Sequence, residues 1–272
     1  SSETFAICEV VRCFKDDNVV HVDGNINPVR DIETINLELI FADIETVNKR
    51  LDKARKNLKA DKKYQAEIDV LEKIKENLEN GISARAINFK EEEQEIVKDM
   101  FLLTTKPILY IANVSEEQME DAENDEMVKR VKEYAQKENA EVIPLCVKIE
   151  EELSGLEDED KKEMLDALGL DESGLDKVIK KSYDLLGLMS FLTAGEPEVR
   201  AWTIKKGTKA PAAAGKIHSD IERGFIKAEI VTYDDLIKEG SMVAAKEKGL
   251  VRSEGKEYIM QDGDIVLFKF NV

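Results

Sequence analysis

Residues 107–116 read PILYIANVSE, and this stretch decides the fold. The apolar run Pro107–Ala112 predicts a buried strand that ends at Asn113, because a short apolar run bounded by a turn former is typical of a strand covered on both faces. A charged amphipathic helix is expected over Asp125–Asn139, and a further strand over Glu141–Val147. The order strand, helix, strand predicts a parallel sheet with a right-handed crossover, and therefore an α/β fold.

Both predicted strands end at an edge of the sheet where a ligand can bind, because ligands of open α/β sheets bind beyond the carboxyl ends of the strands. Asn113 can offer its amide to a purine edge, and Glu116, three residues later, can accept from neighbouring donors. The second strand would bring the backbone groups of Cys146 and Val147 beside the same pocket. The alternatives are structural, since Asn after a strand is commonly a turn former and Glu116 can be a solvated loop acid.

Upstream of this sheet, Phe5–Phe14 predicts another buried strand, and residues 31–95 predict two helices. A buried parallel strand needs neighbours on both sides, so we expect the chain to begin within a domain. The first helix carries a heptad-like apolar seam of Leu37, Phe41, Ile44, Val47, Leu51, Ala54 and Leu58, and the second one of Tyr64, Ile68, Leu71, Ile74 and Leu78. Gly81 is placed to end the second helix. Two such helices joined by a short polar turn form an antiparallel coiled-coil hairpin, whose seam indicates packing and no particular partner.

The rest of the chain predicts helices first and short strands later. Helices are expected over Glu150–Leu168 and Gly174–Leu186, with Ser173 as a cap for the latter. In residues 188–272 the predicted strands are Val199–Ile204, Phe225–Val231 and Ile265–Val272, the short helices are Thr232–Glu239 and Ser241–Glu247, and Asp262–Gly263 is a hairpin-type turn signal. A small mixed sheet around one helix, of the ubiquitin-like β-grasp type, fits this pattern.

The net charge is unevenly distributed, and this limits the partners. The 272 residues include 40 Lys plus Arg and 58 Asp plus Glu, which gives a net charge of −18. Residues 188–272 contain 13 basic and 13 acidic residues, so the whole excess lies in residues 1–187. Binding to a phosphate backbone without regard to sequence needs a basic surface. We therefore expect any contact with nucleic acid to be local, and no sequence-specific binding to DNA.

The composition also argues against a membrane or disulfide-based protein. The longest apolar runs, such as Pro107–Ala112, fall far short of the ~20 residues that span a bilayer, and no signal peptide is evident. Three cysteines in a chain of this length favour reduced thiols, so a cytoplasmic location is expected. Cys8 and Cys13 lack a second pair that would complete a zinc site, so we interpret them as small hydrophobic residues and assign no metal ligand.

Several motifs together resemble one protein family. They are VVRCF at 10–14, HVDG at 21–24, NP at 27–28, DIETIN at 31–36, NVSE at 113–116, TAG at 193–195, VRAWTI at 199–204, GKIHSD at 215–220, RGFI at 223–226, QDGD at 261–264 and FNV at 270–272. On these motifs, which cover nearly the whole chain, the sequence is similar to the YchF family of Obg-related ATPases. The resemblance implies a P-loop NTPase domain over residues 1–30 and 96–187, interrupted by the coiled-coil hairpin of residues 31–95. It also implies a C-terminal TGS domain over residues 188–272.

One feature of that family is absent, because no G-x-x-x-x-G-K-[ST] phosphate loop occurs in this sequence. The resemblance therefore implies an incomplete P-loop NTPase sheet, and a fragment that by itself should not hydrolyse a nucleoside triphosphate. The backbone amides and the Lys that would cradle the phosphates are missing. The cofactors implied for the intact protein are ATP, or GTP, together with Mg²⁺, whose ligands are not in this chain.

The resemblance also assigns roles to individual residues. Guanine-specific relatives carry N-K-x-D, whereas here Val114 occupies the Lys position and Glu116 the Asp position. This departure implies ATP rather than GTP, with Asn113 reading the base and Val114 packing near it. By the same resemblance His21 lies in a loop near the phosphates, where an imidazole could orient the attacking water as a catalytic residue. The alternative for His21 is a loop histidine that bonds its own backbone.

The partners follow from the last part of the chain. Its cations lie close together around Trp202 and Phe225, and they are Lys205, Lys206, Lys209, Lys216, Arg223 and Lys227. Clustered cations beside aromatic residues can bind RNA, although Trp202, on a predicted strand, is expected to pack in the core. His218 is interpreted as structural or as a partner contact. Two functions remain open: a nucleotide-switch ATPase that contacts the ribosome or RNA through its hairpin and TGS domain, or a non-catalytic ribosome- or protein-binding module.

Overall fold

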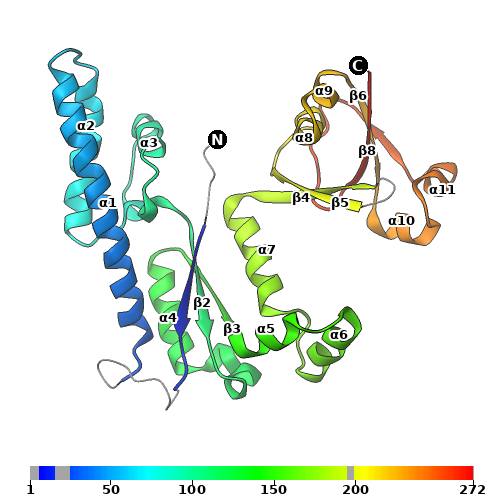
Figure 1. The fold of residues 1–272 in the computed structure, drawn as a ribbon, viewed down its shortest axis with the longest axis horizontal. Helices are drawn as coiled ribbons and strands as arrows, with labels where there is room; N and C mark the ends of the chain where they lie inside the picture. Colours follow the sequence, from blue (N-terminus) through cyan, green and yellow to red (C-terminus); the bar gives the residue numbers. More distant parts are fainter. Residues whose placement is uncertain (1–5, 16–24, 195–198, 272) are drawn as a thin grey trace. The chain divides into compact units, whose positions relative to one another are not determined.

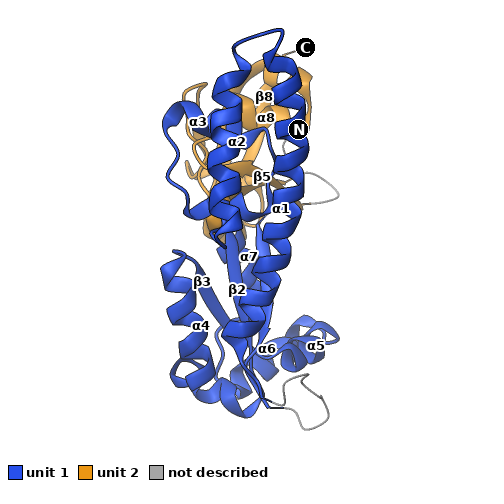
Figure 2. Cartoon of the chain, turned by 90° about the vertical axis from the view of Figure 1, so that its left-hand side faces the viewer, with its two compact units in different colours: residues 1–182 blue, residues 183–272 orange. Residues whose placement is uncertain are grey.

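The computed structural model describes residues 6–15, 25–194 and 199–271. The chain forms two compact units, Ser1–Ser182 and Tyr183–Val272, which are coloured separately in Figure 2. Each unit has its own hydrophobic core. His21 lies outside the described residues.

The sheet of the first unit contains β1 (Ile7–Arg12), β2 (Ile108–Asn113) and β3 (Glu141–Leu145), with β2 in the middle. Both pairings are parallel, as the order strand, helix, strand predicts. The central strand is buried from Ile108 through Ala112, which explains its unbroken apolar sequence. The three strands bring their carboxyl ends to one edge of the sheet.

Helix α4 (Glu126–Lys137) connects β2 to β3 and covers one face of this sheet (Figure 1). It begins where expected because the side chain of Asp125 accepts hydrogen bonds from the N–H groups of Met127 and Val128. Its buried face consists of Val128, Val131 and Ala135, which pack into the core beneath the strands. The short helix η3 (Glu117–Asn124) lies between β2 and α4.

Two long helices leave this sheet and pair with each other, α1 (Pro28–Leu58) and α2 (Tyr64–Glu79) (Figure 1). The second helix buries the predicted positions Ile68, Leu71, Ile74 and Leu78, together with Val70. It ends as expected, because Gly81 adopts a positive φ of 76° that returns the backbone N–H groups to the last turn.

The predicted seam of α1 is wrong in its first half. Leu37 and Phe41 are exposed to 46% and 64%, whereas Asn36, Ile40 and Asp43 are buried. The reason is length, because α1 has 31 residues and α2 only 16. The first half of α1 therefore packs on β1, α4 and the short helix η2 (Leu103–Thr105) instead of on α2. From Val47 onward the seam faces α2 as predicted.

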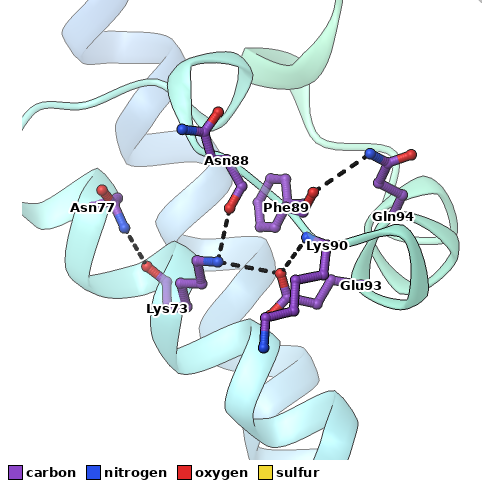
Figure 3. A network of polar contacts seen from close by, with 7 residues as sticks. All are labelled: Lys73, Asn77, Asn88, Phe89, Lys90, Glu93 and Gln94. Carbon is purple, nitrogen blue, oxygen red and sulfur yellow. Dashed lines mark hydrogen bonds and ion pairs between the residues drawn. The ribbon is translucent and has the colours of Figure 1, made fainter.

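The return from α2 to β2 passes through η1 (Ala84–Ala86) and α3 (Glu91–Lys98), and a polar network fixes α3 to α2. Figure 3 shows its centre: Lys73 Nζ donates to the carbonyl of Asn88 (2.8 Å) and lies 3.2 Å from Glu93 Oε2. The same carboxylate oxygen accepts from the N–H of Lys90 (2.8 Å), and these bonds lower the pKa of Glu93. Lys73 also lies over the ring of Phe89, 5.3 Å from its centroid.

After β3 the prediction of one helix over Glu150–Leu168 is wrong. The structure has two helices, α5 (Val147–Ser154) and α6 (Asp158–Ala167). The break lies at Gly155, which ends α5, and Glu157 is extended before the acidic first turn of α6. Helix α7 (Gly174–Leu186) follows with its predicted cap, since Ser173 Oγ accepts from the N–H of Asp176 (3.1 Å).

The second unit is built on a mixed sheet in the order β5-β4-β8-β6-β7. Its elements are β4 (Leu188–Ala194), β5 (Val199–Lys205), α8 (Ala210–Ile217), α9 (Ser219–Arg223), β6 (Phe225–Val231), α10 (Tyr233–Glu239), α11 (Met242–Glu247), β7 (Arg252–Glu254) and β8 (Ile265–Phe270). The predicted mixed sheet is confirmed, because β4 and β8 are parallel and the other pairs antiparallel. Strand β4 and helix α8 were not predicted.

The turn at Asp262–Gly263 does not close a hairpin. Asp262 Oδ1 accepts from the N–H of Ser190 (3.0 Å), and the N–H of Gly263 donates to the carbonyl of the same residue (2.8 Å). The turn therefore fixes the chain to β4 before β8 begins. Among the described residues, no helix is long and apolar enough to cross a membrane.

Candidate functional site

The side chain of Asn113 connects the ends of β2 and β3. Its Oδ1 accepts a hydrogen bond from the backbone N–H of Val147 (3.1 Å), the first residue of α5. The neighbouring backbone N–H of Val114 donates to the carbonyl of Leu145 (2.9 Å). No hydrogen bond from Asn113 Nδ2 is found within the described residues, and the side chain is partly exposed. This nitrogen is therefore available to a ligand at the carboxyl edge of the sheet.

Val114 and Cys146 do not present their side chains to that edge. They are exposed to only 1% and 3%, and both pack in hydrophobic clusters. The side chain of Val114 packs into the core beneath the strand end, and its proposed place beside a base stays a prediction. Only the backbone of these two residues faces the candidate site. Val147, by contrast, is 44% exposed.

Glu116 lies on the surface and forms an ion pair with Lys148, at 3.1 Å between Oε1 and Nζ. The hydrogen bond from the lysine to the Glu116 carboxylate raises the pKa of Lys148. An exposed pair of this kind contributes little to folding, because water screens both charges. The pair has a local effect, because it places the Lys148 cation beside Glu116, a carboxylate that we expected to have no partner.

The loop after Asn113 is held by Gln118, which was not predicted. Gln118 Oε1 accepts from the N–H of Ser115 (2.8 Å), and Ser115 Oγ accepts from the N–H of Gln118 (3.3 Å), which is a capping box. Gln118 Nε2 donates to the carbonyl of Cys13 and to Asp125 Oδ2, each at 2.8 Å. The sequence S-E-E-Q was the available signal, since a Ser followed three residues later by Gln is typical of this box.

Glu150 is a second residue that the sequence did not identify. From α5 it accepts hydrogen bonds from the N–H groups of Gly174 (2.6 Å) and Leu175 (3.1 Å) at the start of α7. A Cβ at Gly174 would lie 2.7 Å from Glu150 Oε1 and 2.7 Å from Leu145 Cβ, so only glycine fits without displacement. The candidate site is thus supported from β3, α5 and α7.

The cysteines are all free, and two of them differ sharply in environment. Cys8 is exposed, 3.8 Å from Ser182 Oγ, whereas Cys13 is buried. Burial, with the negative charges of Asp125 and Asp31, raises the pKa of Cys13 to about 12, so its thiol stays protonated. Within the described ranges no group of three or more His, Cys, Asp and Glu side chains is arranged to hold a metal ion.

In the second unit most of the predicted basic cluster is paired. Lys206 pairs with Asp184 (3.4 Å), Lys209 with Glu257 (2.5 Å), Lys227 with Glu229 (3.7 Å), and Arg223 with Asp220. His218 Nδ1 accepts from the N–H of Asp220 (3.1 Å) and so caps α9. Among the described residues, Lys205 and Lys216 have no ion pair.

Trp202 has the core role that was expected. It packs against the hydrophobic core of the second unit, and its Nε1 donates to Thr193 Oγ1 (2.9 Å). The guanidinium of Arg200 lies 4.1 Å from the centroid of the Trp202 ring system, so a cation covers its outer face.

Comparison with known proteins identifies the family. The chain is 57% identical over 268 residues to the ribosome-binding ATPase YchF of Bacillus subtilis (strain 168), a match that covers 98% of this chain and 73% of the relative. It is 46% identical to the protein of the same name in Escherichia coli O157:H7, over 99% of this chain and 74% of the relative. The chain belongs to the YchF family.

Two further findings agree with this assignment. The family model YchF-GTPase_C, described as "Protein of unknown function (DUF933)", matches residues 188–271. A solved YchF structure, titled "Structure of the Schizosaccharomyces pombe YchF GTPase", aligns with a TM-score of 0.79 at 35% identity, covering 98% of this chain and 73% of that chain. Both units of the fold are therefore YchF-like.

Proposed function

We propose that this chain supplies the base-binding and partner-binding parts of a cytoplasmic nucleotide hydrolase that acts on the ribosome. Its relatives at 46% and 57% identity are named ribosome-binding ATPases. The observation that carries the proposal is the bond from the Val147 N–H to Asn113 Oδ1, which fixes the amide at the carboxyl edge of the sheet. Adenine presents an acceptor, N7, beside a donor, its exocyclic amino group. The free Nδ2 and the second lone pair of Oδ1 match these two groups.

The environment of Glu116 supports ATP over GTP as the preferred nucleotide. A carboxylate that reads guanine accepts from the N–H groups at N1 and N2 of the base. In this chain the carboxylate of Glu116 already accepts from Lys148 Nζ, so guanine would have to displace a cation. Adenine can bind without displacing this cation, because it has no donor at those positions.

The proposal places phosphate and magnesium binding outside these 272 residues, since the sequence contains no G-x-x-x-x-G-K-[ST] pattern. When bound, the nucleoside triphosphate would supply the phosphoanhydride bond that is hydrolysed, and Mg²⁺ would neutralise the charge that develops on the phosphates. The residues of this chain bind and orient the base through Asn113 and the backbone of Val147. Gln118 and Glu150 keep the loop and α5 in the geometry that this contact needs.

Equilibrium titration of the full-length protein with fluorescent ATP and GTP analogues tests the base site. We expect tighter binding of ATP, and we expect Asn113→Ala to weaken ATP binding by about tenfold, the value of one good polar contact. Asn57→Ala, on the helical pair, is the matched control and should bind like the wild type. A clear preference for GTP, or unchanged ATP binding in Asn113→Ala, would contradict the proposal.

His21 is proposed to orient the attacking water, a role that rests on the sequence resemblance alone. We expect His21→Ala in the full-length protein to lower the hydrolysis rate by about 10²-fold or more while leaving the Kd for ATP unchanged, as for the loss of a general base. Single-turnover hydrolysis and nucleotide titration on the same preparation separate the two effects. Unchanged turnover would return His21 to a structural role.

A second function is favoured by one observation. Asn113 also satisfies the first N–H of α5, and the side chains of Val114 and Cys146 are buried, which is what a purely structural strand end requires. A non-catalytic module that binds the ribosome or a protein fits this arrangement. If the full-length protein co-sedimented with ribosomes but bound neither nucleotide, this second function would replace the first.

A further inference from the structure

The second unit has one long sheet edge that no described strand covers, the outer side of β5. In the strand order β5-β4-β8-β6-β7 the two edge strands are β5 and β7. Strand β7 has only three residues, whereas β5 has seven. Proteins commonly protect an edge with a very short strand, a proline or a bulge. The short β7 fits this rule, but β5 contains no proline and pairs with β4 in an unbroken register over its whole length.

The register also shows which backbone groups of β5 point outward. The N–H of Lys206 donates to the carbonyl of Gly187 (2.8 Å), directly after the last pair of the two strands. Hydrogen-bonded positions alternate along an antiparallel pair, so the even-numbered residues of β5 are the ones that bond to β4. The N–H and C=O groups of the residues between them face away from β4, and these residues are Val199, Ala201 and Thr203.

The side chains next to this edge leave room for an added strand. Ala201 and Thr203 are small and exposed, and they share one face of the sheet because side chains alternate along a strand. On the other face Trp202 packs against the core, and the guanidinium of Arg200 covers its ring. An incoming strand would therefore meet small side chains on one face and an aromatic ring with a cation on the other.

The charge around the edge is exclusively positive. Residues 199–217, which include β5, the turn after it and α8, contain five cations and no acid, in a chain whose net charge is −18. Two of these cations, Lys206 and Lys209, are paired with acids. Arg200, Lys205 and Lys216 have no ion pair among the described residues. Such a surface favours a partner that carries carboxylates, and it disfavours a second copy of this chain, which would add cations and no acid.

We propose that β5 binds an acidic peptide in extended conformation, which adds a strand to the five-stranded sheet of the second unit. The peptide backbone would exchange hydrogen bonds with Ala201 and Thr203, and its carboxylates would lie beside Arg200 and Lys205. In recognition of this kind the main chain supplies affinity and alternate side chains supply specificity. RNA matches the charge of the surface but not its row of backbone groups, because a sugar–phosphate backbone has no N–H donors for the outward carbonyls.

Titration of the full-length protein with a short synthetic peptide tests this proposal. The peptide has blocked ends, alternates valine with glutamate and carries a fluorescent label, so that anisotropy measures binding. We expect saturable binding, and we expect Ala201→Pro to weaken it by about tenfold or more. Proline removes an N–H that faces the peptide and not β4, a position where an edge strand tolerates it. Ala201→Val keeps this N–H, so it is the matched control and should bind the peptide like the wild type.

A second peptide, with lysine in place of glutamate, tests the role of charge. It should bind at least about tenfold more weakly than the glutamate peptide, because its cations would approach those of the protein. Arg200→Gln should weaken binding of the glutamate peptide and should not weaken binding of the lysine peptide. Equal binding of the two peptides would overturn the proposal, as would the absence of binding at millimolar concentration or unchanged binding in Ala201→Pro.

Two other occupants of the edge are distinguished in the same experiment. An RNA oligonucleotide that displaces the peptide and binds Ala201→Pro as tightly as the wild type would show a phosphate-binding surface instead. A dimer of the peptide-free protein that Ala201→Pro abolishes would assign the edge to a second copy. Circular dichroism confirms that each variant is folded. If Ala201→Pro fails to fold, a glutamate peptide N-methylated throughout replaces it, and binding of this peptide to the wild type as tight as that of the unmethylated one counts against strand addition.

This inference is independent of the nucleotide site, since β5 belongs to the second unit and Asn113 to the first. Ala201→Pro should therefore leave ATP binding unchanged, and Asn113→Ala should bind the peptide like the wild type. Failure of either proposal is visible without reference to the other.

Discussion

Glu9 places a carboxyl group inside the first unit, and burial raises its pKa from 4.5 to about 7. The negative charge of Glu138 raises this pKa further, and Arg85 opposes the effect. The hydroxyl of Tyr110, opposite Glu9 on β2, donates to Glu138 and leaves Glu9 without that bond. The native state consequently holds a proton on Glu9 at pH values where the unfolded chain has released it.

The sign of the resulting pH dependence follows from that proton. Below pH 4.5 both states are protonated and Glu9 has no effect; between 4.5 and 7 the native state binds more protons, so its free energy of unfolding falls as pH rises. The fall is up to about 1.4 kcal/mol per pH unit. Glu9→Gln should remove it, raising the free energy of unfolding by about 3 kcal/mol at pH 8 and by almost nothing at pH 4.

Urea unfolding of wild type and Glu9→Gln over this pH range measures the difference. Glu133→Gln, at an exposed position of α4, is the control and should follow the wild type at every pH. A Glu9→Gln profile parallel to that of the wild type would show that Glu9 is ionised normally in the folded protein.

The sequence predicts that Asn113 lies at the end of a strand. It does not predict which way the side chains of the neighbouring residues point. Val114 and Cys146 are apolar or nearly so, and nothing in their residue types says which way they point. Orientation depends on the register of β2 against β1 and β3, which the structure supplies. Glu9 was hidden for a similar reason, since one charged residue in an apolar run gives no sign that it is buried.

Among the elements, α1 depends on one buried acid for its contact with the segment before β2. Asp43 is 2% exposed; its Oδ1 accepts from the N–H of Leu103 (2.8 Å), and its Oδ2 accepts from the N–H (2.8 Å) and the hydroxyl (2.6 Å) of Thr104. The hydroxyl of Thr104 in turn accepts from the N–H of Ala84 (3.0 Å). One carboxylate thus joins α1, η1 and η2.

Asp43→Ala should therefore lower the free energy of unfolding by about 3 kcal/mol or more, because two backbone N–H groups and a hydroxyl lose a charged acceptor in a buried place. Asp43→Asn keeps one acceptor oxygen, so its free energy of unfolding should lie between those of the wild type and Asp43→Ala. Asp52→Ala, on an exposed face of the same helix, should change stability by less than about 0.5 kcal/mol. Chemical denaturation measures all three, and equal effects of the two alanine variants would refute the assignment.

The prediction for α1 and α2 failed where their lengths diverge. The heptad spacing is a sound guide from Val47 onward, where a second helix lies opposite. Before that point the helix meets a sheet, another helix and a short turn, and its buried face includes the polar residues Asn36 and Asp43. A pattern of apolar residues cannot reveal such a face, because polar groups become buried only through partners distant in the sequence.

At the scale of the whole molecule, the charge of the second unit governs the proposed contact with the ribosome. Most of its clustered cations are paired with acids, whereas Lys205 and Lys216 have no ion pair among the described residues. Unpaired cations contribute more to a phosphate surface, because no adjacent carboxylate cancels their field.

The double variant Lys205→Ala/Lys216→Ala should therefore reduce co-sedimentation of the full-length protein with ribosomes by several-fold at low salt. The matched double variant Lys206→Ala/Lys209→Ala, which removes the same charge from paired positions, should reduce it less. Raising the salt concentration should diminish the difference, since screening weakens both contributions. Equal losses in the two variants would argue against a contact at this surface.

The fold class could be derived from the order of strands and helices, and both sheets agree with it. The placement of β4 and α8 could not be derived. β4 follows α7 without an intervening turn signal beyond Gly187, and α8 is an Ala-rich stretch with little periodicity. Helix α8 is stable because Ala210, Ala213 and Ala214 let it approach the sheet closely, which is a property of the packed unit rather than of the segment.

The length of α1 has a mechanical consequence. A helix of 31 residues extends about 46 Å, and about 33 Å separate Asn36 near its base from Leu58 at its far end. Over that length, a rotation of α1 by about 5° at its base moves its far end by about 3 Å. Because the first half of α1 packs on β1, α4 and η2, a small change in that packing would displace the far end of α1 more than any other part of the helix.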